Sequence, residues 1–80
     1  MNNIQQRVTR CFLNVFPDLS EREISRASTA SIAAWDSVAH ITLLSAIAQE
    51  FGCSLQFDDF EELTSYELIV DRLENANQNA

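Results

Sequence analysis

The sequence predicts an all-α domain, a four-helix bundle of three longer helices and one short helix. Three observations support this fold class. Apolar residues recur at three- and four-residue spacing in several segments. No segment alternates apolar and polar residues for long enough to support a sheet. The 80 residues are enough for one small core, so residues 1–80 are expected to form a single domain.

The first helix is expected over about residues 3–16. Asn2 or Asn3 is a plausible cap, and Pro17 should end the helix. Its apolar face would consist of Ile4, Val8, Cys11, Phe12 and Val15.

A long loop should follow from Asp18 to Trp35, because this stretch is rich in Ser, Thr and Ala. Ser20 and Glu23 have the spacing of a capping box, so a short helical turn starting there is an alternative within the loop. The apolar anchors of the loop are Leu19, Ile24 and Ile32.

The second helix is expected over residues 37–51. Asp36 or Ser37 would cap it with a side-chain oxygen, and Gly52 would end it because glycine adopts the left-handed conformation without a Cβ penalty. Its buried stripe is predicted to contain Leu43, Leu44, Ile47 and Phe51, with Val38 and Ile41 at the edges.

Two further helices complete the prediction. After Leu55 and Phe57, a short acidic helix is expected over residues 58–62, with Phe60 and Leu63 facing inward. The last helix is expected over residues 65–75, before a fraying polar tail at 76–80. Thr64 and Glu67 have capping-box spacing at its start. Its apolar stripe would contain Tyr66, Ile69, Val70 and Leu73.

The charge is strongly uneven along the chain. The formal net charge is −7, made up of +1 over residues 1–35 and −8 over residues 36–80, and no lysine is present. Such a field repels nucleic acids and anionic lipid surfaces, so basic protein surfaces are the expected partners. No apolar stretch suggests a leader or a membrane span, and a soluble, cytoplasmic protein is expected.

Metal sites and disulfides are not expected. Cys11 and Cys53 are too few for a disulfide framework and do not form a C-x-x-C pair. With His40 as the single histidine, the chain lacks the four Cys or His ligands of a usual zinc site. We expect both cysteines to be reduced thiols that pack.

The segment Trp35-Asp36-Ser37-Val38 lies between the long loop and the second helix. Here the chain resembles acyl and peptidyl carrier proteins, whose attachment motif is Asp-Ser-Leu at the start of the second helix. The resemblance covers residues 4–74: a first helix, a long loop, the Asp-Ser motif, a helix ending in Glu50-Phe51-Gly52, a short acidic helix and a final helix. It implies an acyl-carrier-like bundle.

The resemblance also implies a function. A phosphopantetheinyl transferase would use coenzyme A and magnesium to attach 4′-phosphopantetheine to Ser37. The thiol of this arm, and neither Cys11 nor Cys53, would carry acyl or aminoacyl groups as thioesters. A helix start suits the phosphodiester, because free N–H groups and the positive end of the helix dipole favour negative charge. The protein would be a carrier without catalytic residues.

The same resemblance suggests how partners would recognise the chain. Asp36 would fix the helix start. The partners would be the transferase and the enzymes that load or transfer acyl groups, and they would bind through basic docking patches. The carrier itself would be a monomer. The expected recognition residues are Asp36, Val38, Ile41, Asp58, Asp59, Glu61 and Glu62. Carriers of fatty-acid synthesis typically display acids along the second helix, where this chain has Ala39, Thr42, Ala48 and Gln49 and keeps only Glu50. We therefore expect a specialised fatty-acid or secondary-metabolite pathway.

Two alternatives remain. Ser37 and His40 share a helical face and could be imagined as a nucleophile and base, but no G-x-S-x-G elbow surrounds the serine. The single glycine also excludes glycine-rich phosphate loops. The main alternative is a non-catalytic, acidic helical adaptor module without a prosthetic group.

Overall fold

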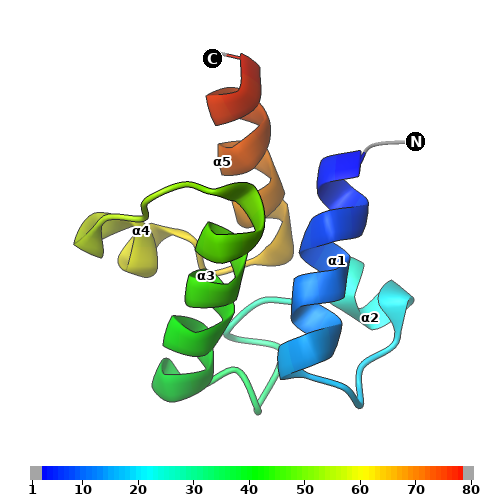
Figure 1. The fold of residues 1–80 in the computed structure, drawn as a ribbon. Coiled ribbons are helices and arrows are strands. Elements are labelled where there is room, and N and C mark those ends of the chain that lie inside the picture. The colour runs from blue at the N-terminus through cyan, green and yellow to red at the C-terminus, as the bar shows by residue number, and fades with distance from the viewer. Residues whose placement is uncertain (1–2, 79–80) are drawn as a thin grey trace.

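The computed structural model describes residues 3–78, with the side chains of Phe57 and residues 76–78 outside that description. The helices are α1 (Asn3–Val15), α2 (Glu21–Ser25), α3 (Ser37–Phe51), α4 (Phe57–Glu62) and α5 (Tyr66–Gln78) (Figure 1). Residues 3–78 contain no strand beyond a single bridge between Ser28 and Ser65. The predicted all-α fold class is confirmed, and α2 is an additional short helix within the long loop. No helix in this range is long and apolar enough to cross a membrane.

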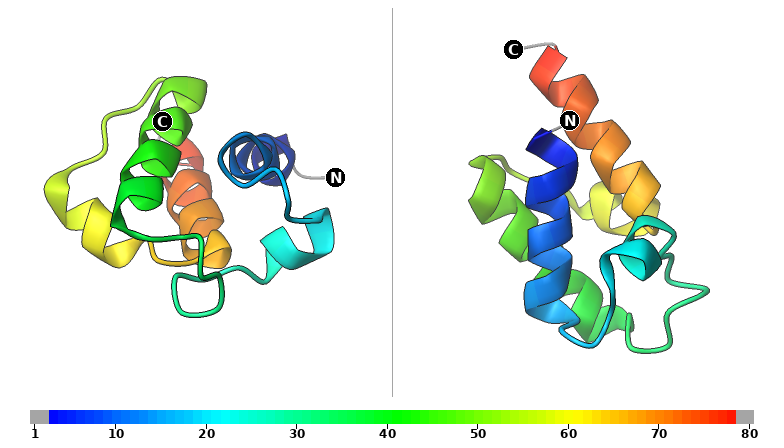
Figure 2. Two further views of the ribbon diagram at one scale, coloured as in Figure 1. Left: turned by 90° about the horizontal axis from the view of Figure 1, so that it is seen from below. Right: turned by 90° about the vertical axis from the view of Figure 1, so that its right-hand side faces the viewer.

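The three longer helices form the body of the bundle. α1 packs against both α3 and α5, and it runs in the opposite direction to them (Figures 1 and 2). α2 contacts α1 and α5, and α4 contacts α3. Both ends of the described chain lie at one end of the bundle, and the start of α3 lies at the other end (Figure 1).

The core is formed by aromatic and aliphatic side chains from every long helix and from the loop. Phe12 lies at its centre, with the ring edge-on to Trp35 at 5.2 Å and to Tyr66 at 5.6 Å between centroids. Edge-to-face pairs at this separation are favourable because the positive ring edge meets the negative ring face. The fully buried side chains of largest volume are Phe12, Ile24, Leu43, Leu44, Ile47, Ile69 and Val8.

The capping box at Ser20 and Glu23 is present. The Glu23 N–H donates to Ser20 Oγ at 3.2 Å, and the Ser20 N–H donates to Glu23 Oε1 at 3.0 Å. These bonds satisfy two backbone donors at the start of α2. The single turn that they stabilise brings Ile24 into the core, where it is fully buried.

The limits of α3 follow from its flanking residues. Asp36, and not Ser37, supplies the side-chain cap. Gly52 adopts a left-handed conformation with φ of 62°, and its N–H donates to the Ala48 carbonyl. Of the predicted stripe, Leu43, Leu44 and Ile47 are buried, but Phe51 is only partly buried.

An α1 residue covers the end of α3. The Arg7 guanidinium lies over the Phe51 ring, 4.2 Å from its centroid. It also pairs with Glu50 Oε2 at 2.8 Å and donates to the Glu50 carbonyl at 2.6 Å. Arg7 therefore satisfies a carbonyl in the last turn of α3 and shields one face of Phe51 from solvent.

Several predicted helix ends differ from the structure. α1 ends at Val15, one residue earlier than expected, and α5 begins at Tyr66, one residue later. α4 begins at Phe57, one residue earlier than expected. At α5 the Leu68 N–H donates to Ser65 Oγ at 3.1 Å, so Ser65, and not Thr64, is the cap. The polar tail is helical as far as Gln78, whereas residues 79 and 80, like the possible cap Asn2, lie outside the described residues.

Candidate functional site at the start of α3

Ser37 is the first residue of α3, and it is exposed. The Ala39 N–H donates to Asp36 Oδ1 at 2.9 Å, and the His40 N–H donates to the Asp36 carbonyl at 2.8 Å. The first N–H groups of a helix have no partner within the helix, so those of Ser37 and Val38 remain available to a ligand. The helix start can therefore bind an anionic group next to the Ser37 hydroxyl.

Two of the predicted recognition residues extend the exposed surface away from Ser37. Val38 is 74% exposed and Ile41 is 56% exposed. Residues three and four positions apart lie on one side of a helix, so Ser37, Val38 and Ile41 form a continuous surface. We call these three residues the α3 face. Among the described residues, Val38 and Ile41 are the most exposed large apolar side chains, and both lie close to Ser37 in the sequence.

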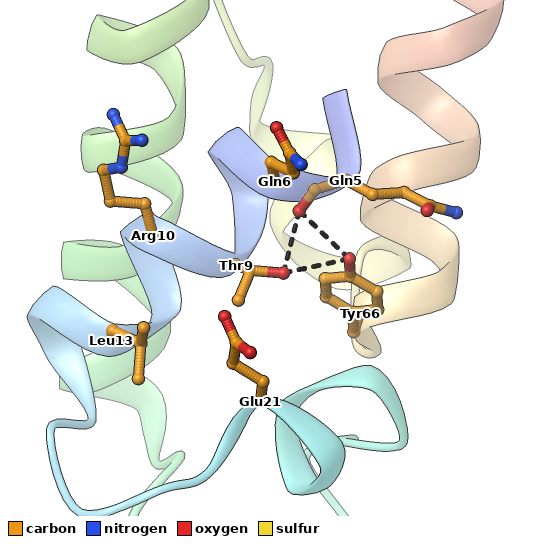
Figure 3. Close-up of a pocket in the computed structure, with 7 residues that line it drawn as sticks. All are labelled: Gln5, Gln6, Thr9, Arg10, Leu13, Glu21 and Tyr66. Carbon is orange, nitrogen blue, oxygen red and sulfur yellow. Dashed lines mark hydrogen bonds between the residues drawn. The ribbon is translucent and has the colours of Figure 1, made fainter. Parts of the chain in front are cut away.

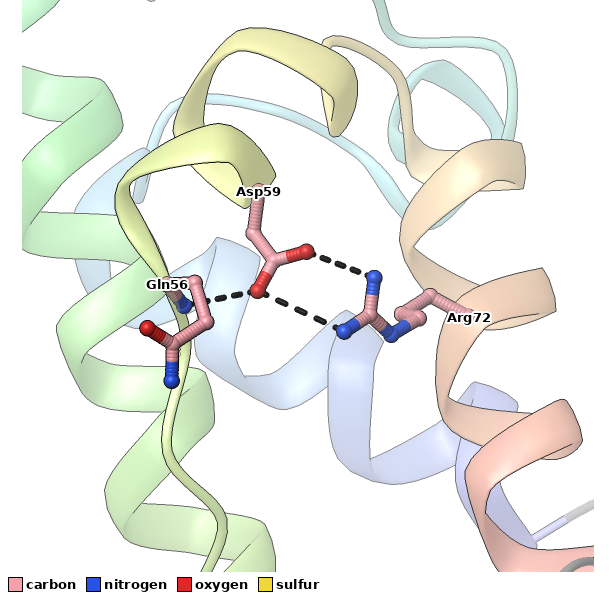
Figure 4. Close-up of polar contacts among 3 residues, drawn as sticks. All are labelled: Gln56, Asp59 and Arg72. Carbon is pink, nitrogen blue, oxygen red and sulfur yellow. Dashed lines mark hydrogen bonds and ion pairs between the residues drawn. The ribbon is translucent and has the colours of Figure 1, made fainter.

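The acidic residues of α4 do not all lie on the surface. Asp58, Glu61 and Glu62 are exposed, but Asp59 is 3% exposed. Asp59 pairs with Arg72 of α5 at 2.5 Å and accepts the Gln56 N–H at 2.7 Å (Figure 4). Its carboxylate therefore fixes α4 to α5, and the prediction that Asp59 faces partners is corrected. Only Asp58, Glu61 and Glu62 of that set are available for docking.

Glu50, the acid that α3 keeps near its end, also takes part in an ion pair. Glu50 forms the ion pair with Arg7 described above, 2.8 Å between Arg7 Nε and Glu50 Oε2. Its charge is thus partly neutralised, and it lies at the far end of α3 from Ser37. Among the predicted recognition residues, the exposed acids are therefore Asp36, Asp58, Glu61 and Glu62.

A hydrogen-bonded chain that sequence reasoning missed lies beside Ser37. The Trp35 Nε1–H donates to His40 Nδ1 at 2.9 Å, and His40 Nε2 lies 2.6 Å from the Phe60 carbonyl oxygen. Both ring nitrogens of His40 are thus occupied by groups other than Ser37. His40 cannot act as a base for Ser37 in this arrangement, which argues against the hydrolase alternative. Trp35 is itself a buried anchor of the loop.

One cleft on the described surface contains none of the predicted site residues. It has a volume of about 590 Å³ and is lined by residues of α1, α2 and α5 (Figure 3). The Tyr66 hydroxyl donates to the Gln5 carbonyl at 3.1 Å and lies 3.1 Å from Thr9 Oγ1. These bonds join α1 to α5. A smaller cleft of about 280 Å³ lies beside Ser37.

The Cys11 thiol is poorly suited to act as a nucleophile. Burial, and to a lesser extent the Glu50 carboxylate, raise the pKa of the Cys11 thiol above its usual value, against the opposing effect of Arg7 and Arg10. Cys11 is thus held as the neutral, weakly nucleophilic thiol. No cluster of three or more His, Cys, Asp or Glu side chains that could hold a metal ion occurs among the described residues.

Taken together, the fold and the site define a small helical bundle that presents an exposed serine at a capped helix start. Over 78 residues the chain is 24% identical to the acyl carrier protein of Buchnera aphidicola subsp. Schizaphis graminum (strain Sg), an alignment that covers 98% of this chain and 99% of that protein. The resemblance to acyl carrier proteins that the motifs indicated is confirmed by this similarity. No protein-family profile and no solved structure matches the chain.

Proposed function

We propose that this protein is an acyl carrier protein that bears 4′-phosphopantetheine on Ser37. The observation that carries the proposal is the exposed Ser37 hydroxyl at the start of α3, where Asp36 caps the helix and backbone N–H groups remain available. Neutral backbone donors and the helix dipole suit a phosphodiester at this place. The residues present therefore fit the prosthetic group.

The bound arm would supply a terminal thiol that carries acyl or aminoacyl groups as thioesters. The chain itself would hold the arm and present it to enzymes, and it needs no catalytic residue. Tethering the intermediate raises its effective concentration at each docked enzyme. The similarity to a named acyl carrier protein over nearly the whole chain supports this role.

The proposed partners are a phosphopantetheinyl transferase and acyl-loading or acyl-transferring enzymes. They would contact the α3 face through apolar groups and the exposed acids of α4 through basic patches. Because α3 lacks acids at Ala39, Thr42, Ala48 and Gln49, we propose dedicated partners of a specialised pathway. The whole chain would work as one carrier domain, as a monomer in the cytoplasm.

Incubation of the apo protein with coenzyme A, magnesium and a transferase of broad specificity tests the proposal. Intact mass spectrometry should detect the addition of one phosphopantetheine group, and peptide mapping should assign it to Ser37. A folded protein that gains no mass with transferases of two different specificities would instead favour the adaptor alternative.

Replacement of Asp36 separates capping from recognition. Asp36→Ala should lower the free energy of unfolding by about 1 kcal/mol, because it removes the acceptor for the Ala39 N–H. Asp36→Asn should retain most of this stability, since asparagine caps helices about as well. If the transferase recognises the carboxylate, both variants should load more slowly than wild type. Urea unfolding and loading rates measure the two effects, and wild-type loading by Asp36→Asn would contradict recognition of the charge.

Neutralisation of the exposed α4 acids should weaken docking. The double variant Glu61→Gln/Glu62→Gln should lower kcat/KM for transferase loading several-fold at low salt, because charge complementarity raises the encounter rate. The difference should shrink at 1 M salt, where the screening length falls from about 10 Å at 0.1 M to about 3 Å. Glu67→Gln/Asp71→Asn on α5 is the matched control with the same charge change. Equal losses in both double variants would show that only the net charge matters.

A further inference from the structure

The smaller cleft begins at the Ser37 side chain itself. It has a volume of about 280 Å³ and is lined by Thr29, Trp35, Asp36, Ser37 and His40. Sites for whole small ligands usually have volumes of about 300–1,000 Å³. The cleft can therefore accept a segment of a group attached to Ser37, but not a whole arm with its cargo.

One wall of this cleft is held rigidly. Trp35 is 3% exposed, and its ring packs against Phe12 at 5.2 Å and Phe16 at 6.1 Å between centroids. On the cleft side it is fixed by the hydrogen bond from its Nε1–H to His40 Nδ1. The position of the indole ring thus depends on the orientation of the His40 imidazole.

The partners of His40 allow one neutral tautomer. The indole N–H is only a donor, so Nδ1 must accept, and the Phe60 carbonyl is only an acceptor, so Nε2 must carry the proton. In this tautomer His40 connects three parts of the chain: the loop before Ser37, α3 and α4. The hydrogen-bond chain therefore fixes the wall of the cleft to the body of α4.

We propose that this cleft seats the uncharged segment of the phosphopantetheine arm that follows the phosphate, and that His40 is the residue that positions its Trp35 wall. The inference rests on the proposed function and deepens it. The branched methyl groups and amides of that segment match a cleft lined by the apolar Trp35 and the polar Thr29. The Asp36 carboxylate also lines the cleft and would repel the phosphodiester, so the cleft would take only the uncharged segment.

Two substitutions distinguish positioning from simple packing. A glutamine amide presents an acceptor and a donor at nearly the same separation as the two imidazole nitrogens, so His40→Gln can accept from Trp35 and donate to Phe60. His40→Phe keeps an aromatic ring but can make neither bond. The arm should contact Trp35 in the first variant and not in the second.

The experiment compares apo and loaded protein by NMR spectroscopy, with loading verified by intact mass. In loaded wild type we expect nuclear Overhauser effects between the arm methyl groups and the Trp35 ring, and a shift of the Trp35 Nε1–H resonance. The Tyr66 resonances, at the other cleft, should not move. The imidazole nitrogen shifts of apo protein should identify the Nε2–H tautomer. His40→Gln should keep the arm contacts, and His40→Phe should lose them.

The outcomes separate this inference from the proposed function. Failure of wild type to gain mass would overturn the proposed function. Normal mass gain without contacts between the arm and Trp35, or with unchanged contacts in His40→Phe, would overturn only the present inference, as would an Nδ1–H tautomer. If His40→Phe does not fold, the spectra of wild type and His40→Gln test the inference. Contacts between the arm and Trp35 in both proteins would support it. Loss of these contacts in His40→Gln, or their absence from both proteins, would overturn it.

Discussion

Ser37→Ala is expected to abolish loading with phosphopantetheine completely, because the variant lacks the only hydroxyl at the start of α3. The fold should persist. Asp36 supplies the cap, Ser37 is exposed, and alanine is favourable within a helix, so stability should change by less than about 1 kcal/mol. Intact mass after incubation with coenzyme A and transferase measures the first effect, and circular dichroism with urea unfolding measures the second.

Ser45→Ala is the matched control for this experiment. Ser45 is also an exposed serine on α3, but it lies two turns beyond the helix start. This variant should load like wild type. If the Ser37→Ala variant gains the mass of the arm at another residue, the assignment of the attachment site is contradicted.

Phe12→Ala should cost about 3–5 kcal/mol of folding free energy, because the ring is fully buried. Its removal would leave a cavity bordered by Phe16, Trp35 and Tyr66. The total stability of a natural domain is about 5–15 kcal/mol, so the variant should be close to unfolding. Urea denaturation followed by circular dichroism measures the loss.

Phe51→Ala is the comparison, because it makes the same replacement of phenylalanine by alanine at a less buried position. Phe51 is partly buried, and Arg7 covers one face of its ring. Its replacement should therefore cost clearly less than that of Phe12, although the sequence pattern placed both in buried stripes. Equal losses of free energy in the two variants would show that burial does not distinguish these positions.

The features predicted from sequence are those determined by neighbouring residues. α3 could be located because Asp36 and Gly52 are local signals for its two ends, and the spacing of Leu43, Leu44 and Ile47 marks its buried side. The local signals failed where two residues compete. Thr64 and Ser65 are both good caps by residue type, and in the structure the cap is Ser65, which also forms the isolated bridge with Ser28.

The features that could not be predicted depend on contacts between distant segments. Asp59 and Arg72 are 13 residues apart and lie on different helices, and nothing in the acidic run of α4 distinguishes Asp59 from its exposed neighbours. His40 likewise bonds to the Phe60 carbonyl, a backbone atom that carries no sequence signal. Burial and pairing of polar groups are consequences of the assembled bundle, so sequence patterns reveal the candidate serine more readily than its surroundings.

The arrangement of the chain ends has a practical consequence. Both ends of the described chain emerge at the end of the bundle opposite the start of α3 (Figure 1). Immobilisation on a bead or sensor chip through either terminus should therefore orient every molecule with its serine toward the bulk solution. A second protein joined genetically at either terminus should likewise leave the helix start unobstructed for an approaching enzyme.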